Sequence, residues 1–316
     1  MRFFQWNIAA MLCGFILDLL IGDPEGWTHP VIWIGKYISF VEKKFRLRGG
    51  DLRKSAVLLT ASTVLIGMAA TAAVLFVLSR LGEIALFIGM CVISWWAISC
   101  KCLAKEGEGV ARALHISLER GRRQVGRIVG RDTSALSETE IICATVETIA
   151  ENTTDGVIAP MLYLILGGPV LAMGFKAAST LDSMVGYLDE KYRDIGWSSA
   201  RLDDILNFIP ARVTGFLMCV SAFICGLDGK NALRILKRDH ANHLSPNCAW
   251  SEAAVAGALR VQLGGTHFYF GKLVEKPTIG DDDMPITIMD IHRASLLMLI
   301  SAMITALVAL LAGVLM

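Results

Sequence analysis

A dense polar run between two apolar segments is the part of the sequence best suited to chemistry. Residues 176–212 hold six carboxylates and five cationic side chains. Carboxylate oxygens suit Mg²⁺, and neighbouring Lys and Arg suit phosphates. Surface ion pairs of a solvated loop are the alternative interpretation, but an unpaired charge in apolar surroundings is costly and favours a functional site. The charged residues are Asp182, Asp189, Glu190, Asp194, Asp203 and Asp204, with Lys176, Lys191, Arg193, Arg201 and Arg212.

A second acidic group lies on a helix whose start can be predicted. Ser137 with Glu140 three residues later is a capping box, which opens a helix. On that helix Glu147 and Glu151 are four residues apart and share one face. Asp155 extends this acidic row if the helix continues, although the surrounding Asn-Thr-Thr-Asp-Gly segment is more typical of C-terminal unwinding.

Two histidines follow later in the chain, at positions 240 and 243. A zinc site at His240 and His243 is a weak interpretation, because no convincing third ligand accompanies them. Ser245 followed by Pro246 predicts the N-cap and first residue of a helix through Ala258. The free backbone N–H groups of such a helix start are suited to binding an anion.

The common nucleotide and hydrolase motifs are absent from the sequence. There is no GxxxxGK[ST], no GxGxxG, no GxSxG and no HExxH. A bound nucleotide must therefore lie outside the common loops. Three consecutive aspartates, Asp281 to Asp283, stand between Gly280 and Pro285 and predict an exposed turn.

The elements that position these residues are expected to be membrane helices. Hydrophobic residues make up 54% of the 316, which excludes a soluble globule and a disordered chain. Several long runs contain no Asp, Glu, Lys or Arg. A run of about 17 to 25 uncharged, mostly apolar residues is long enough to span a bilayer. A net charge of +1 gives no indication of a nucleic-acid partner. The eight cysteines have no paired CxxC spacing and are expected to be reduced packing residues.

The sequence predicts an all-α, polytopic integral membrane protein with four to six membrane segments and cytoplasmic helical loops. Two segments are expected to be broken or re-entrant, one at Pro160 and 167–169 and one at Pro210, so a polar cavity is implied. Six basic residues in 42–54 place that loop in the cytoplasm. The chain, 1–316, is interpreted as a single membrane-embedded catalytic domain, with segments at about 4–21, 55–78, 84–100, 157–175, 205–227 and 294–316.

Several motifs, in order along nearly the whole chain, resemble the membrane-bound adenosylcobinamide-phosphate synthase family of cobalamin biosynthesis. They are Asp-Leu-Leu-Ile-Gly-Asp-Pro at 18–24 with His29-Pro30, Ala-Glu-Asn-Thr-Thr-Asp-Gly-Val-Ile-Ala-Pro at 150–160, the run 176–212, and 245–265. Small departures from the family pattern at Ser179, Cys248, Ala249 and Arg260 concern local packing.

The resemblance implies a carbon–nitrogen ligase of the acid–amine type. Such an enzyme uses ATP to join adenosylcobyric acid to (R)-1-amino-2-propanol phosphate, or to ethanolamine phosphate, giving adenosylcobinamide phosphate. An acyl phosphate is the expected intermediate, and Mg²⁺ is expected to neutralise the transferred phosphoryl group. The implied location is the cell (cytoplasmic) membrane, with the active site at its cytoplasmic face. The implied partners are the lipid bilayer and other corrinoid-assembly membrane enzymes.

The resemblance also carries roles to individual residues. Glu151, Asp155 and Asp182 are expected to bind Mg²⁺ or the incoming ammonium, and His240 or His243 to accept a proton from the amine. The remaining substrate- and phosphate-binding candidates are Asn152, Lys176, Arg193, Arg201, Arg238 and Asn247, with Tyr187, Tyr192, Trp197 and Trp250 as corrin-packing or membrane-interface aromatics.

Two alternatives from other classes stay open. An Mg-dependent membrane prenyltransferase would also place an acidic row over an apolar tunnel, and it would turn over an isoprenyl diphosphate. A non-catalytic corrinoid-binding membrane organiser would bind corrinoid without turnover.

Overall fold

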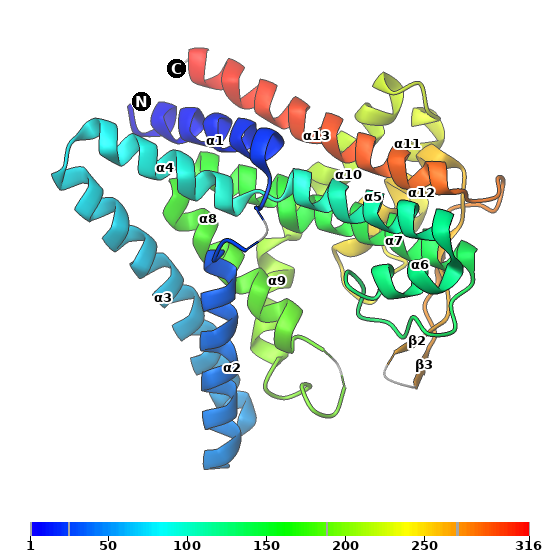
Figure 1. The fold of residues 1–316 in the computed structure, drawn as a ribbon, viewed down its shortest axis with the longest axis horizontal. Helices are drawn as coiled ribbons and strands as arrows, with labels where there is room; N and C mark the ends of the chain where they lie inside the picture. The colour runs from blue at the N-terminus through cyan, green and yellow to red at the C-terminus, as the bar shows by residue number, and fades with distance from the viewer. Residues whose placement is uncertain (1, 25, 188, 270–271, 316) are drawn as a thin grey trace. The chain divides into compact units, whose positions relative to one another are not determined.

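The computed structural model describes residues 2–24, 26–187, 189–269 and 272–315, and these are mostly helical with very little strand, as predicted (Figure 1). The N-terminal helices are α1 (Arg2–Ile21), α2 (Pro30–Arg48), α3 (Leu52–Arg80), α4 (Glu83–Ala97), α5 (Cys100–Ile116) and α6 (Leu118–Val125). They are followed by α7 (Glu138–Thr153), the π-helical turn η1 (Thr154–Ile158), α8 (Ala159–Val185), α9 (Trp197–Leu206), α10 (Phe208–Ile224), α11 (Gly229–Asp239), α12 (Cys248–Leu259) and α13 (Ile288–Leu315). The short strands are β1 (Leu263–Gly264), β2 (His267–Tyr269), β3 (Lys272–Val274) and β4 (Thr278–Ile279).

Five helical stretches in the described residues are long and apolar enough to cross a membrane, or six if a bent pair is one span. They are Phe3–Ile21, Leu52–Arg80, Glu83–Ile116, Glu138–Val185 and Ile288–Leu315, with Trp197–Leu206 and Phe208–Ile224 as the bent pair. Each contains or overlaps one predicted segment. The protein is therefore a polytopic helical membrane protein, with spans longer than the charge-free runs.

The helix that carries the acidic row does not unwind after Asn152. It continues through the π-helical turn η1 directly into α8, so the prediction of C-terminal unwinding was wrong. The predicted break at Pro160 is also absent, because the wider π turn before it lets the helix pass a residue that cannot donate a hydrogen bond. The break expected at 167–169 is present. Gly168 has φ 66°, and a Cβ there would lie 2.6 Å from Asn7 Oδ1.

The expected break in segment 205–227 is confirmed as a 50° bend between α9 and α10. Pro210 lies in the first turn of α10 and has no N–H to offer the carbonyl of Leu206. The Tyr163 hydroxyl donates to that carbonyl instead, at 2.8 Å. The bend is thus stabilised by a replacement hydrogen bond.

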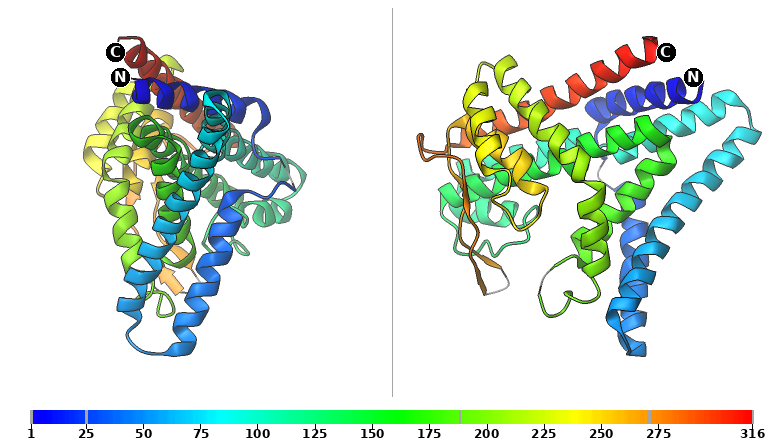
Figure 2. Two further views of the ribbon diagram at one scale, coloured as in Figure 1. Left: turned by 90° about the vertical axis from the view of Figure 1, so that its left-hand side faces the viewer. Right: turned by 180° about the vertical axis from the view of Figure 1, so that it is seen from behind.

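The chain folds into two compact units, and the first comprises residues 1–99, 159–207 and 306–316. Within it α1 packs on α4, where Gly14 is needed because a Cβ would lie 2.6 Å from Ser94 Cβ. Helices α2, α3 and α8 also pack side by side (Figure 2). Their shared core is apolar and consists of Ile38, Leu59, Leu181, Val185 and Ile195.

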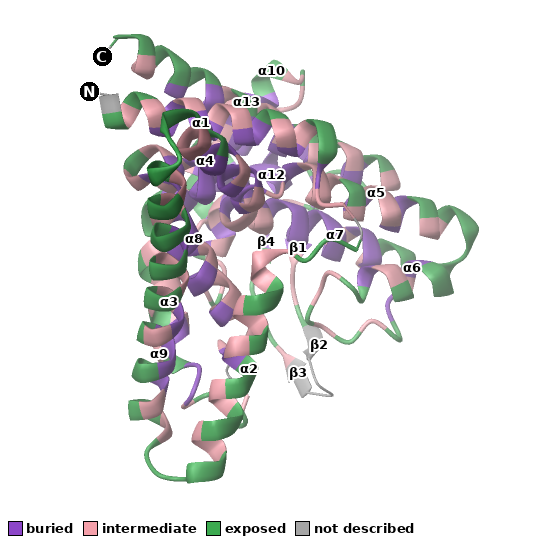
Figure 3. Cartoon of the chain, turned by 60° about the vertical axis from the view of Figure 1, so that its left-hand side comes forward, coloured by how far each residue is buried: buried purple, intermediate pink, exposed green. Residues whose placement is uncertain are grey.

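Much of α3 is both apolar and exposed, as the colouring in Figure 3 shows. Leu65 is 63% exposed and Phe76 is 64% exposed. A soluble protein rarely leaves so continuous an apolar face in water, whereas lipid covers it at no cost. The exposure of α3 therefore agrees with a position in the bilayer.

The second unit comprises residues 100–158 and 208–305. Helix α12 is almost fully buried and packs closely on α11, where a Cβ on Gly257 would lie 2.7 Å from Ala232 Cα. Strand β1 pairs antiparallel with β4, and β2 pairs with β3. Helix α12 begins at Cys248 rather than beside Pro246, because the Ser245 hydroxyl accepts the Asn247 N–H in a preceding turn.

Candidate functional site

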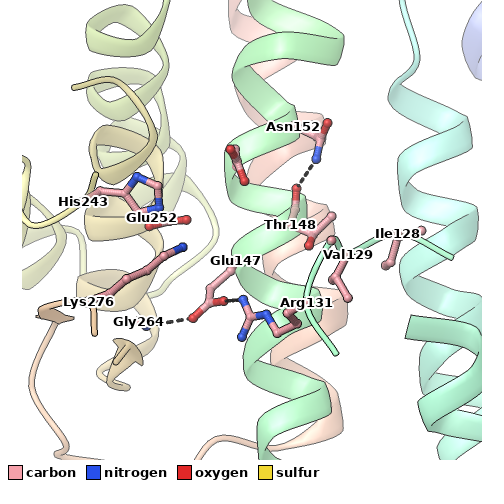
Figure 4. A pocket seen from close by; sticks show the side chains of 12 residues that line it. Ile128, Val129, Arg131, Glu147, Thr148, Asn152, His243, Glu252, Gly264 and Lys276 are labelled. Atoms are coloured by element: carbon pink, nitrogen blue, oxygen red, sulfur yellow. Dashed lines mark hydrogen bonds and ion pairs between the residues drawn. The ribbon is translucent and has the colours of Figure 1, made fainter. Parts of the chain in front are cut away.

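A polar cavity of about 120 Å³ lies within the second unit. Figure 4 shows side chains from α7 and the 126–137 loop on one side, facing α12, the loop before it and the β1 and β4 region on the other. The capping box of Ser137 and Glu140 is present and fixes the start of α7. The lining residues are Ile128, Val129, Gly130, Arg131, Glu147, Thr148, Glu151, Asn152, His243, Glu252, Gly264 and Lys276.

Glu147 forms the firmest polar contacts of this cavity. Its carboxylate forms an ion pair with Arg131, and both side chains are at least nine-tenths buried. Its other oxygen accepts the backbone N–H of Gly264 at 2.7 Å. A buried ion pair needs such additional hydrogen bonds to offset its desolvation. Glu147 thereby joins α7 to the 126–137 loop and to β1.

Glu252 is a carboxyl group 4% exposed on the otherwise apolar helix α12. Burial raises its pKa well above the usual range, and the nearby Glu147 and Glu151 raise that pKa further, whereas Lys276 and Arg131 lower it. In the described part of the chain its carboxylate has no hydrogen-bond partner. A cation bound beside Glu252 would favour its ionised form, so the cavity is suited to receive a further positive charge.

The predicted residues Glu151 and Asn152 do line the cavity. Glu151 Oε1 accepts a hydrogen bond from the Cys248 thiol at 3.0 Å. Burial raises the pKa of this thiol, so it stays protonated and donates. The Asn152 amide donates to the Thr148 carbonyl at 3.0 Å. Asp155 lies in η1 and is not among the lining residues, so the acidic row of α7 ends at Glu151.

The two histidines take different places. His243 lines the cavity, and burial together with Lys276 lowers its pKa, so it is neutral near pH 7. Its Nδ1 accepts the Ser245 N–H at 3.0 Å, so the proton of the neutral ring is on Nε2. His240 Nδ1 lies 3.1 Å from the Leu236 carbonyl, and its ring packs 4.6 Å from Trp250. His240 is therefore a packing residue outside the cavity lining.

Arg238, predicted to bind phosphate, is held by carboxylates. It donates to both oxygens of Asp239 at 2.6 and 2.8 Å and to Asp281 at 2.6 Å. Arg234 also pairs with Asp281. Asn247, the other candidate in this region, accepts from Arg212 at 3.3 Å. The aspartate turn is exposed at Asp282 as predicted, but Asp281 fastens the turn to α11.

We expect Asp281→Asn to destabilise the protein slightly, by about 1 kcal/mol, because exposed ion pairs contribute little each. Hydrogen bonds from Arg234 and Arg238 lower the pKa of Asp281. This stabilisation is therefore present at neutral pH and is lost as the pH falls below about 4, toward the lower folded-state pKa. Thermal unfolding in detergent at two pH values measures it, and Asp282→Asn, which should be silent, is the control.

The other predicted residues belong to the first unit. Lys176 donates to the Ala97 carbonyl at 3.3 Å and to Ser99 Oγ at 3.1 Å, so it caps the end of α4. Asp182 is half-buried near the end of α8. The Tyr187 and Tyr192 rings lie 6.0 Å apart, and the cation–π partners of Tyr192 are Arg46 and Lys191. The exposed residues of this group are Tyr187, Arg193, Arg201 and Trp197.

A resident metal site is not supported by the described residues. No group of three or more His, Cys, Asp or Glu side chains among them is arranged to hold a metal ion. Glu151 and Asp155 belong to the second unit and Asp182 to the first. Mg²⁺, however, is commonly bound by only one or two carboxylates together with substrate phosphates. The ligand set expected from the sequence stays a prediction without structural support.

Four charged residues of the cavity were not predicted as site residues. They are Arg131, Glu147, Glu252 and Lys276. For Glu252 a signal existed, since a lone carboxylate in a run of alanines is costly to bury without a purpose. Lys276 carries no such signal, because it lies in a polar, irregular segment where a lysine is ordinary.

Comparison with known proteins agrees with the resemblance seen in the sequence. A family model described as "CobD/Cbib protein" matches residues 11–298. "Cobalamin biosynthesis protein CobD" of Streptococcus sanguinis (strain SK36) is 45% identical over 298 residues, which cover 94% of each chain. "Cobalamin biosynthesis protein CbiB" of Salmonella typhi is 45% identical over 303 residues, again covering 94% of each chain.

A third relative, "Cobalamin biosynthesis protein CobD" of Listeria monocytogenes serovar 1/2a, is 47% identical over 286 residues, covering 88% of this chain and 90% of the relative. No solved structure matches the chain significantly. The match to the family model and these identities extend over almost the full length. The chain therefore belongs to the CobD/CbiB family of cobalamin biosynthesis proteins.

Proposed function

We propose that the protein is an ATP-dependent ligase that joins a carboxylate of adenosylcobyric acid to the amine of aminopropanol phosphate or ethanolamine phosphate. Membership of the family supports the corrinoid substrate. The observation that supports the amine is the cavity of the second unit, where the Glu252 carboxyl is buried beside Glu147 and Glu151, so that a bound ammonium would favour its ionised form. Such a cavity attracts a compact cation, and the amine substrate is an ammonium at neutral pH.

The proposed chemistry activates the carboxylate first. A carboxylate is a poor acyl donor, so transfer of the ATP γ-phosphoryl group to it gives an acyl phosphate. The amine then forms the C–N bond, the bond from the acyl carbon to the phosphate oxygen breaks, and phosphate leaves with the electron pair. We propose that Mg²⁺ enters with the ATP phosphates and neutralises their charge.

The membrane setting of the reaction is also a proposal. The loop basic residues favour the cell membrane with the site at its cytoplasmic face, where ATP and the amino-alcohol phosphate are found. The exposed apolar helices give a large corrin with apolar faces an interface to approach. Other corrinoid-assembly enzymes of the same membrane are the partners that this location favours.

The test uses purified full-length protein in detergent with adenosylcobyric acid, Mg-ATP and aminopropanol phosphate or ethanolamine phosphate. Mass spectrometry should show the amide product, dependent on ATP and on the amine. Corrinoid binding without turnover would instead support a non-catalytic organiser, and turnover of an added isoprenyl diphosphate would support a prenyltransferase.

A further inference from the structure

Glu252 is the cavity residue in which three properties meet. It is 4% exposed, its carboxylate has no hydrogen-bond partner in the described part of the chain, and it lines the cavity between α12 and α7. Its own helix buries Ser251 and Ala253 on either side of it, so the helix supplies no compensating charge. An ionisable group buried in this way is a candidate for proton transfer.

The other two glutamates and the histidine of the cavity are committed to other contacts. Glu147 is bound by Arg131 and by the Gly264 N–H. Glu151 accepts the Cys248 thiol. His243 uses the lone pair of Nδ1 for the Ser245 N–H and carries its proton on Nε2, so neither ring nitrogen is placed to accept a proton. Glu252 is left as the acceptor.

We propose that the ammonium of the amine substrate binds beside Glu151 and Glu252, and that Glu252 is the catalytic residue that removes its proton before amide formation. This inference rests on the proposed function. The surroundings suit the transfer, since Glu147 and Glu151 favour uptake of a proton by Glu252, while Lys276 and Arg131 oppose it without matching the effect of burial. A general base of this kind accelerates a reaction by about 10²- to 10⁴-fold.

One N–H proton of the ammonium passes to the Glu252 carboxylate, which leaves a lone pair on nitrogen to attack the acyl carbon of the acyl phosphate. The C–N bond forms, the C–O bond to phosphate breaks, and the departing phosphate takes the second N–H proton. Glu252 then releases its proton to water, which regenerates the carboxylate.

The test separates activation of the carboxylate from attack by the amine. Glu252→Gln keeps the size of the side chain and removes the basic oxygen. Hydroxylamine, mostly uncharged at neutral pH, needs neither an ammonium site nor a base to trap an activated acyl group as a hydroxamate. We expect Glu252→Gln to form amide from aminopropanol phosphate at least about 10²-fold more slowly than wild type, yet to form corrinoid hydroxamate from Mg-ATP and hydroxylamine at a rate close to wild type.

The hydroxamate measurement also reports whether the variant is folded. Glu275→Gln is the matched control, because it removes an exposed carboxylate next to Lys276 and should leave both rates unchanged. Amide formation by Glu252→Gln at the wild-type rate would overturn the inference, and so would parallel loss of amide and hydroxamate, which would assign Glu252 to activation or folding. A wild-type protein that forms neither product would instead contradict the proposed function itself.

Discussion

Replacing Arg131 by alanine should lower the free energy of unfolding by about 3 to 5 kcal/mol, because it leaves a buried carboxylate without its counter-charge. Arg131 and Glu147 are 8% and 7% exposed as side chains, and Glu147 also accepts the Gly264 N–H. The variant therefore removes the ion pair that connects α7 to the 126–137 loop, and it leaves the Gly264 N–H of β1 as the remaining hydrogen-bond donor to Glu147. Denaturant or thermal unfolding in detergent measures the loss.

The matched control is Arg127→Ala. Arg127 forms an ion pair with Glu106 at 3.5 Å, and its side chain is 65% exposed. It should cost less than about 1 kcal/mol. The double variant Arg131→Ala/Glu147→Gln should recover most of the stability, because an uncharged amide still accepts the Gly264 N–H. If Arg127→Ala and Arg131→Ala lowered the free energy of unfolding equally, the buried ion pair would stabilise the protein no more than the exposed one.

Selectivity for the phosphorylated amine should depend on Lys276 and not on Arg238. We expect wild type to prefer aminopropanol phosphate over free aminopropanol by at least about 10²-fold in kcat/KM, since a site built for a phosphate rejects the analogue without it. Lys276 lines the cavity, whereas Arg238 is saturated by Asp239 and Asp281. Lys276→Gln should slow the phosphorylated substrate by about 10- to 150-fold, equivalent to charge-assisted bonds of about 1.5 to 3 kcal/mol.

Free aminopropanol provides the internal reference for this measurement, since Lys276→Gln should leave its kcat/KM nearly unchanged. Arg238→Gln should alter both amines by the same factor, through the stability of the turn at Asp281. If Arg238→Gln lowered the ratio of kcat/KM for the phosphorylated amine to kcat/KM for the free amine, and Lys276→Gln left this ratio unchanged, the phosphate would instead bind at residues 238–247, as predicted from the sequence.

The membrane helices could be predicted because their signals are local. Runs without charge mark the spans, and the Ser137 and Glu140 capping box marks the start of α7. The π turn after Thr153 could not be predicted, because Asn-Thr-Thr-Asp-Gly has the composition of a helix end. Tertiary packing of a buried segment overrode that local preference.

The candidate site was predictable in part for the same reason. Glu151, Asn152 and His243 lie near recognisable helix boundaries, and all three line the cavity. The contacts of Arg238 could be predicted only in part, because its partners differ in distance along the chain: Asp239 is adjacent, but Asp281 is brought to it only by the fold. Spacing in a sequence reveals faces of one helix and says nothing about contacts made across 40 or more residues.

The π turn of η1 also limits how this segment can tolerate insertions and deletions. Such a turn amounts to one residue more than a regular α-helix needs over the same length. Removing a single residue from Thr154–Ile158 would therefore leave a regular α-helix with the faces on either side nearly unchanged, whereas each further residue inserted would turn the following helix by about 100° around its axis. Homologous chains should therefore tolerate the loss of one residue in this segment better than the gain of one.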